Sequence, residues 1–131
     1  MIDISLLCVA VLGLLTVGLG FGVSMQRRDA AKSVGLPDDP TSGLLKWGRA
    51  HANTAEYAPI LALIIYVLGT SSQPAWVPIV MVLATASRLV FAAGMIFPAT
   101  LAKPNLLRFC GALGTYVFGI ALATALLLTA L

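Results

Sequence analysis

Four long apolar stretches, separated by shorter polar segments, dominate the pattern of the chain. They run over about residues 4–25, 48–69, 75–97 and 107–131. Each stretch is close to the ~20 residues that a helix needs to cross a hydrocarbon core about 30 Å thick. The alternating segments of about ten residues that a membrane β-barrel requires do not occur in the sequence. The pattern therefore predicts one all-α domain, residues 1–131, folded as a four-helix bundle in a membrane.

Composition supports the same class of protein. The chain of 131 residues is 60% hydrophobic and 10% charged, whereas soluble domains carry about 25% charged residues. A soluble domain of this size leaves a large fraction of its surface in water, so it could not hide so much apolar surface. We therefore expect an integral membrane protein.

Positive charges concentrate in two of the three loops. The first loop, residues 26–46, and the third loop carry them, whereas the second loop, residues 70–76, has no charged residue. By the positive-inside rule, the first and third loops face the cytoplasm and both termini face the other side. Trp47 and Trp76 then lie at opposite membrane interfaces. The net charge of +3 is explained by this topology and does not indicate a nucleic-acid partner.

The second apolar stretch begins with polar residues at helical spacing. Arg49, Asn53 and Glu56 stand at i, i+4 and i+7, so on a helix they share one face. Ionisable residues within a membrane span are costly and are functional candidates by default. This stripe predicts a functional site at the cytoplasmic side of the bundle.

The third stretch is interrupted by a single charge, Arg88. Glu56 lies roughly 10 Å along its helix from Arg49, and Arg88 lies roughly 13 Å from the cytoplasmic end of its own helix. Opposite charges at similar depth can neutralise each other in a low dielectric. We therefore expect an Arg88–Glu56 ion pair, which either only sets the helix register or shapes a polar cavity. The polar neighbours of Glu56 favour the cavity.

Other reactive side chains are less informative. His51 lies about half a turn away from the line of Arg49, Asn53 and Glu56 on the helix. A role at the membrane interface and a role in binding a ligand are therefore equally favoured for it. A metal site is not expected, because no second histidine, cysteine or carboxylate joins His51 at ligand spacing. Cys8 and Cys110 fall in different stretches and are interpreted as small apolar core residues.

The run Arg49-x-His51-x-Asn53-x-x-Glu56-Tyr57-x-Pro59 resembles the second-helix signature of the MAPEG family, the membrane-associated proteins in eicosanoid and glutathione metabolism. The resemblance extends to Ser87-Arg88-Leu89 and to Pro98 through Pro104-Asn105, and so covers essentially the whole chain. It is greatest to small bacterial members that are similar to microsomal glutathione transferases. The resemblance thus implies a multi-pass protein of a bacterial inner membrane.

The family resemblance also implies an assembly and a reaction. The protein would be a homotrimer, with glutathione as co-substrate in a cleft between neighbouring subunits and without a metal. The thiol of glutathione would be activated for conjugation to an apolar electrophile, for peroxide reduction or for isomerisation. The implied glutathione-binding residues are Arg49, Asn53, Glu56, Tyr57 and Arg88, with His51 as a further candidate and with Arg27 or Arg28 from the neighbouring subunit. Arg108 or Lys103 would stabilise the thiolate.

Two positions depart from the family pattern and leave alternatives open. Eicosanoid-synthase members carry aromatic or imidazole and tyrosine groups three and seven residues after the third-helix arginine, where this chain has Phe91 and Met95. We expect these two side chains to pack the cavity, without the tyrosine hydroxyl. The protein is then either a glutathione transferase or peroxidase, or a catalytically silent ligand-binding membrane protein. A small four-span transporter is less favoured, since its essential carboxylate would lie in the first stretch, which has no charge between Asp3 and its end near residue 25.

Overall fold

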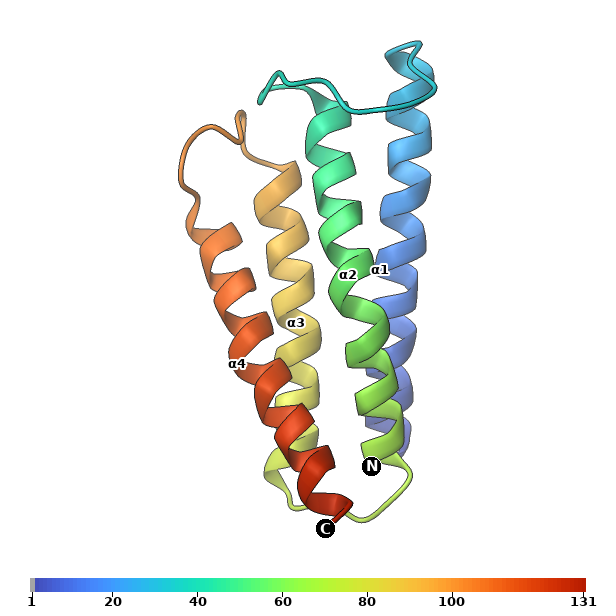
Figure 1. The fold of residues 1–131 in the computed structure, drawn as a ribbon, viewed down its shortest axis with the longest axis vertical. Coiled ribbons are helices and arrows are strands. Elements are labelled where there is room, and N and C mark those ends of the chain that lie inside the picture. The colour runs from blue at the N-terminus through green and yellow to red at the C-terminus, as the bar shows by residue number, and fades with distance from the viewer. Residues whose placement is uncertain (1) are drawn as a thin grey trace.

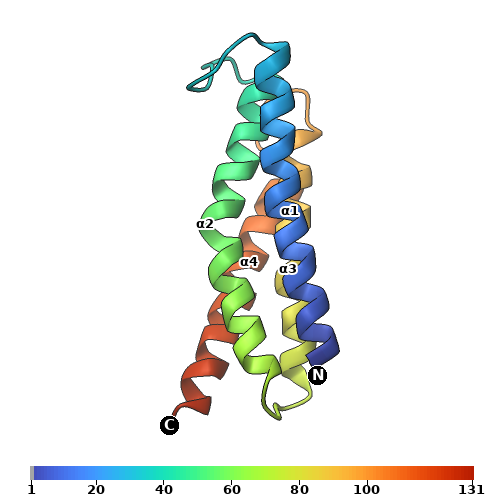
Figure 2. The same cartoon turned by 90° about the vertical axis from the view of Figure 1, so that its right-hand side faces the viewer.

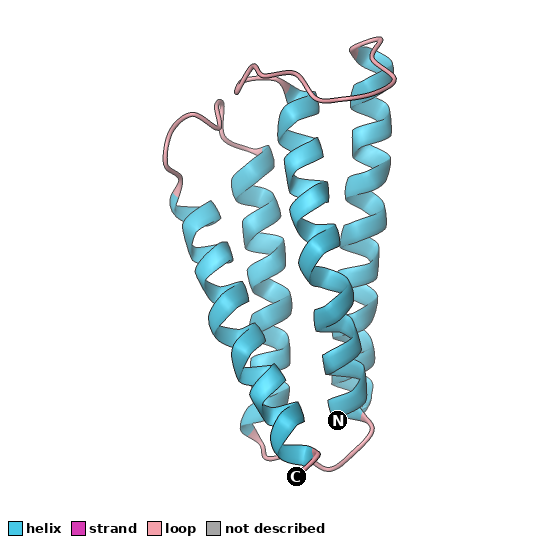
Figure 3. Ribbon diagram, in the orientation of Figure 1, coloured by secondary structure: helices cyan, strands magenta, loops and turns pink. Residues whose placement is uncertain are grey.

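A computed structural model describes residues 2–131 and contains four helices. These are α1 (Ile2–Asp29), α2 (Gly43–Gly69), α3 (Trp76–Ile96) and α4 (Leu106–Thr129), joined by three loops (Figure 3). Each helix is long and apolar enough to cross a membrane, which confirms the predicted all-α bundle. Met1, which the predicted domain includes, lies outside the described residues.

The helices run alternately in opposite directions (Figure 1). α1 packs against α2 and α3, and α4 packs against α3 and α2, so α1 and α4 form opposite edges of the bundle (Figures 1 and 2). The first and third loops lie at one end, and the start of α1 and the end of α4 lie at the other with the second loop (Figure 1). The two positively charged loops therefore share an end, and the cytoplasmic location of that end stays a prediction.

The helices at the first loop are longer than the apolar stretches predicted. α1 continues to Asp29, because Arg27 and Arg28 in its last turn interact favourably with the carbonyl end of the helix dipole. α2 already begins at Gly43, where the Ser42 hydroxyl caps the helix by accepting the Leu45 N–H. The loop predicted over residues 26–46 is therefore only residues 30–42, since hydropathy marks the hydrocarbon crossing and not the helix ends.

The interior of the bundle holds two hydrophobic clusters. One, nearer the chain termini, includes Leu12, Ile65 and Met81. The other, nearer the first and third loops, includes Leu19 and Phe91. Large apolar side chains also cover the outside of the helices, which is the arrangement expected where lipid is the solvent; examples are Leu14, Val17 and Phe21 on α1 and Ile120, Leu127 and Leu128 on α4.

The third loop is tied to the first loop and to the start of α2. The Leu101 N–H donates to the Pro40 carbonyl at 2.9 Å, and Lys46 Nζ donates to the Pro98 carbonyl at 3.1 Å. Within the first loop, the backbone N–H and the hydroxyl of Thr41 both donate to Asp39 and lower the pKa of that carboxyl. These bonds hold the third loop over the end of the bundle at which the polar stripe begins.

Candidate functional site

A cavity with a volume of about 400 Å³ lies among α2, α3, α4 and the third loop. We call this cavity the polar pocket. Its charged and amide side chains come from α2 and α4, and its apolar side chains come from α3, the third loop and Ala52 of α2. The lining residues are Arg49, Ala52, Asn53, Glu56, Phe91, Met95, Leu101 and Arg108.

The α2 wall of the polar pocket consists of the predicted stripe. Arg49, Asn53 and Glu56 all line it, as expected for residues that recur about once per helical turn. Arg49 and Glu56 are exposed, and Asn53 is half-buried. The three therefore present a cation, an amide and an anion to the same space.

Arg108 forms the opposite wall, in the first turn of α4. Asn105 caps this helix by accepting the Arg108 backbone N–H at 3.2 Å. The Arg108 guanidinium donates to the carbonyls of Leu101 at 3.3 Å and of Lys103 at 3.1 Å. The third loop thus holds the guanidinium at the pocket, while the guanidinium retains donors for a ligand because it has five N–H groups.

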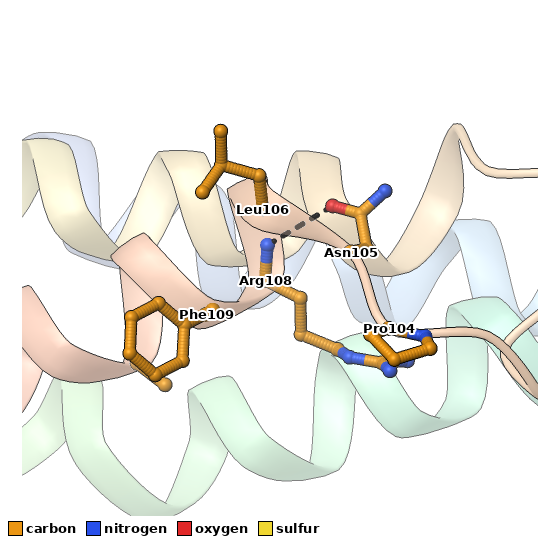
Figure 4. Close-up of a pocket in the computed structure, with 6 residues that line it drawn as sticks. Pro104, Asn105, Leu106, Arg108 and Phe109 are labelled. Atoms are coloured by element: carbon orange, nitrogen blue, oxygen red, sulfur yellow. Dashed lines mark hydrogen bonds between the residues drawn. The ribbon is translucent and has the colours of Figure 1, made fainter.

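A second cavity lies on the other side of Arg108. It has a volume of about 560 Å³ and is lined mostly by apolar atoms, from Pro104, Leu106, Phe109 and Ala112 together with Asn105 and Arg108. Figure 4 shows the Arg108 side chain running alongside Pro104, with the dashed bond from its backbone to Asn105. We call this cavity the apolar hollow. Arg108 lines both cavities and so stands at the boundary between a polar and an apolar site.

The predicted Arg88–Glu56 ion pair is not formed within the described residues 2–131. Arg88 is buried, with 1% of its surface exposed, whereas Glu56 is exposed at the pocket. Arg88 Nη2 instead donates to Asn53 Oδ1 at 2.7 Å and to Thr54 Oγ1 at 3.2 Å. The two charged residues lie at similar depth, but similar depth does not mean that their side chains point toward each other. On α2, Asn53 and Thr54 face Arg88, whereas Glu56 does not.

Neutral groups surround the Arg88 guanidinium on its remaining sides. Nη1 donates to Thr115 Oγ1 at 3.3 Å, and the Thr115 hydroxyl in turn donates to the Gly111 carbonyl at 2.7 Å. The rings of Phe91 and Tyr57 lie 4.9 Å and 5.3 Å from the guanidinium carbon. Aromatic faces attract a cation, and the attraction strengthens when water is excluded. Arg88 is therefore held by α2 and α4 as well as by its own helix.

The other sequence candidates lie outside the lining of the polar pocket. His51 faces α1, with its Nε2 against Gly20, and the Tyr57 hydroxyl donates to that of Tyr116 at 3.3 Å. Three candidates remain. At the end of α1, Arg27 donates to the Gly35 carbonyl and Arg28 pairs with Asp29. Lys103, in the third loop, is exposed.

Cys8 is buried in the core, as predicted, but Cys110 is exposed on α4. The prediction for Cys110 was wrong because its helix lies at an edge of the bundle, where one face has no neighbour within the chain. Among residues 2–131, no three histidine, cysteine, aspartate or glutamate side chains are grouped so that they could hold a metal ion.

Sequence reasoning missed several residues that complete the site. Leu101 lines the polar pocket from the third loop, and Thr54 and Thr115 accept hydrogen bonds from Arg88. A large apolar side chain within a loop was a usable signal for Leu101. Neither threonine stands out in the sequence, because threonine is common in membrane helices and its role here depends on contacts between helices.

Two comparisons with known proteins bear on this site. The model of the MAPEG family matches residues 5–128, which include nearly all of the four helices and every residue that lines the polar pocket. A search of curated proteins found no match.

Proposed function

The chain belongs to the MAPEG family, an integral multi-pass membrane protein family that includes glutathione transferases, and from this premise we propose that it binds glutathione in the polar pocket. We further propose that it activates the glutathione thiol for transfer to lipophilic electrophiles or for peroxide reduction. The observation that carries the proposal is the meeting of Arg49, Asn53, Glu56 and Arg108 around one cavity at the end of a membrane bundle.

The charges of the polar pocket match those of glutathione. The tripeptide has two carboxylates and one ammonium at neutral pH. Arg49 and Arg108 provide guanidinium donors, which suit carboxylates because the planar fork can bond both oxygens. The Glu56 carboxylate can accept hydrogen bonds from the ammonium, and the Asn53 carboxamide can form a hydrogen bond with a peptide group of glutathione.

Arg108 is the better candidate of the two cations considered for the thiolate. It lines both cavities, whereas Lys103 is exposed and contributes its backbone carbonyl to Arg108. A fixed cation beside a thiol favours the thiolate, which is the nucleophilic form. The thiol proton would leave to water, and the sulfur would attack an electrophile held in the apolar hollow. With a chlorinated nitrobenzene, a carbon–sulfur bond forms and chloride departs.

We propose a homotrimer, with the pocket completed by a neighbouring subunit. Arg49 and Glu56 are exposed in a single chain although they lie on a helix that crosses the membrane. Uncovered charges are costly there, so a second subunit that shields them would remove this cost. Arg27 or Arg28 of that subunit would then supply a further cation. Detergent-corrected mass or crosslinking tests the trimer.

The test of function is glutathione binding and turnover by the purified protein in detergent. We expect binding at millimolar glutathione and conjugation to a chlorinated nitrobenzene. Arg49→Ala and Glu56→Ala should each weaken binding about tenfold or more, because a charged hydrogen bond contributes about 1.5–3 kcal/mol. Lys103→Ala is the matched control and should bind normally. A wild-type protein that fails to bind millimolar glutathione would refute the proposed site.

One observation favours a second candidate, a silent ligand-binding protein. Phe91 and Met95 line the polar pocket, so the α3 wall has neither an imidazole nor a tyrosine hydroxyl to assist the sulfur. Binding of glutathione without turnover of either an electrophile or a peroxide would select this second function.

A further inference from the structure

We propose that Arg88 is a positioning residue that sets the orientation of the Asn53 carboxamide, so that this wall of the polar pocket offers a hydrogen-bond donor. The inference rests on the proposed function for the identity of the ligand. Arg88 does not itself line the polar pocket, whereas Asn53 does, so the hydrogen bond to a ligand would be made by Asn53 and not by Arg88.

The two ends of the Asn53 carboxamide have opposite hydrogen-bonding character. Its oxygen accepts and its nitrogen donates, although the two ends have nearly the same shape. A guanidinium has donors and no acceptor. The 2.7 Å contact from Arg88 Nη2 is therefore compatible only with the amide oxygen, and the Asn53 Nδ2 branch is left for the pocket.

Arg88 is fixed well enough to impose this choice. Its guanidinium bonds Thr54 on α2 and Thr115 on α4 and lies against the Phe91 and Tyr57 rings. Arg88 Nε is buried and has no hydrogen-bond partner within residues 2–131. The guanidinium therefore has more donors than the bundle has acceptors for them, and rotation of Asn53 would remove one more acceptor. An unmade bond to a buried charged group is costly.

The orientation decides what the pocket accepts. Arg49, Arg108 and the Asn53 nitrogen all donate, and Glu56 is the acceptor among the polar side chains that line it. A ligand must then bring a carbonyl or carboxylate oxygen to Asn53 and a single ammonium to Glu56. Without Arg88, the Asn53 carboxamide could present either its oxygen or its nitrogen to the pocket. Glutathione would then have to select the orientation with the nitrogen toward it, and this selection would weaken binding.

The first experiment separates orientation from folding. Asn53→Asp keeps an oxygen toward Arg88 but removes the N–H donor from the pocket. We expect it to fold with a melting temperature at or above that of wild type and to bind glutathione at least tenfold more weakly. Normal glutathione binding by a folded Asn53→Asp variant would overturn the inference, because the donor would then be irrelevant.

A double-mutant cycle tests whether Arg88 acts through Asn53. Arg88→Met keeps an apolar side chain of comparable length in the buried site and should weaken glutathione binding roughly three- to tenfold, the value of one neutral hydrogen bond. In an Asn53→Ala background, the same change should have no further effect. An equal loss in both backgrounds would show that Arg88 acts independently of Asn53 and would overturn the inference.

A spectroscopic measurement needs no ligand. The sequence contains two asparagines, Asn53 and Asn105, so protein labelled with ¹⁵N-asparagine gives two side-chain amide pairs. Arg88→Met should shift the Asn53 pair and leave Asn105, the cap of α4, in place. An unmoved Asn53 pair would refute the inference. If the Asn53 pair moves but wild type binds no glutathione, the proposed function fails and the orienting role of Arg88 stands.

Discussion

Replacing Gly94 by alanine should weaken glutathione binding, although Gly94 does not line the polar pocket. An added Cβ at Gly94 would lie 2.8 Å from Arg108 Cα and closer still to Arg108 N. Carbon atoms in contact prefer about 3.5–4.0 Å, so α3 and α4 would have to separate by roughly 1 Å. Both neighbouring atoms belong to the backbone and cannot move aside as a side chain would.

The separation would occur at the residue that joins the two cavities. Overpacking of this kind costs about 1–3 kcal/mol, which exceeds the gain of up to about 1 kcal/mol from replacing a helical glycine by alanine. Since Arg108 lies in the first turn of α4 and its guanidinium is held by the third loop, the shift would move its cation relative to Arg49 and Glu56. We therefore expect Gly94→Ala to lower both the melting temperature and glutathione affinity.

Gly18→Ala is the matched control, because an added Cβ at Gly18 meets nothing within 4 Å. It should leave glutathione affinity unchanged and the melting temperature equal or slightly higher. The assay is thermal unfolding in detergent together with equilibrium binding of glutathione to each variant. If Gly94→Ala matched Gly18→Ala in both measurements, close packing of α3 on α4 would not position Arg108.

Three further changes test separate parts of the site. Met95→Tyr adds a hydroxyl to the α3 wall and should raise the rate of conjugation; an unchanged rate would show that the missing hydroxyl does not limit turnover. Lys46→Met removes the bond to Pro98 and should increase proteolysis of the third loop, while persistent protease resistance would argue against this tie. Tyr116→Phe removes the partner of Tyr57 and should cost less than about 1 kcal/mol of stability with normal glutathione binding, so a large binding loss would place Tyr57 at the ligand.

Much of the fold could be predicted because lipid imposes simple rules. Four apolar stretches of sufficient length predict four helices, since every backbone polar group must be bonded within the span. The helix ends were less predictable: α2 begins at a capping serine and α1 ends after two arginines, beyond the apolar region. The stripe of Arg49, Asn53 and Glu56 could also be placed on one face, because helical periodicity is local.

Partners across helices could not be predicted in the same way. Arg88 and Glu56 have opposite charge and similar depth, yet Arg88 bonds Asn53 and Thr54. Opposite charge is visible in a sequence, whereas the rotation of one helix against another depends on how all the side chains between them pack. A buried arginine can also be satisfied by neutral oxygens and aromatic faces, which no charge count reveals.

The class of protein, the four spans and the polar residues that α2 presents could all be predicted, because hydropathy and helical spacing are properties of short segments. Only the packed bundle shows that Arg108 and the stripe line one pocket, that Leu101 lines it too and that Arg88 lies behind Asn53. These relations join residues of different helices and loops, and the close packing of α3 on α4 and the bond between the first and third loops bring them together.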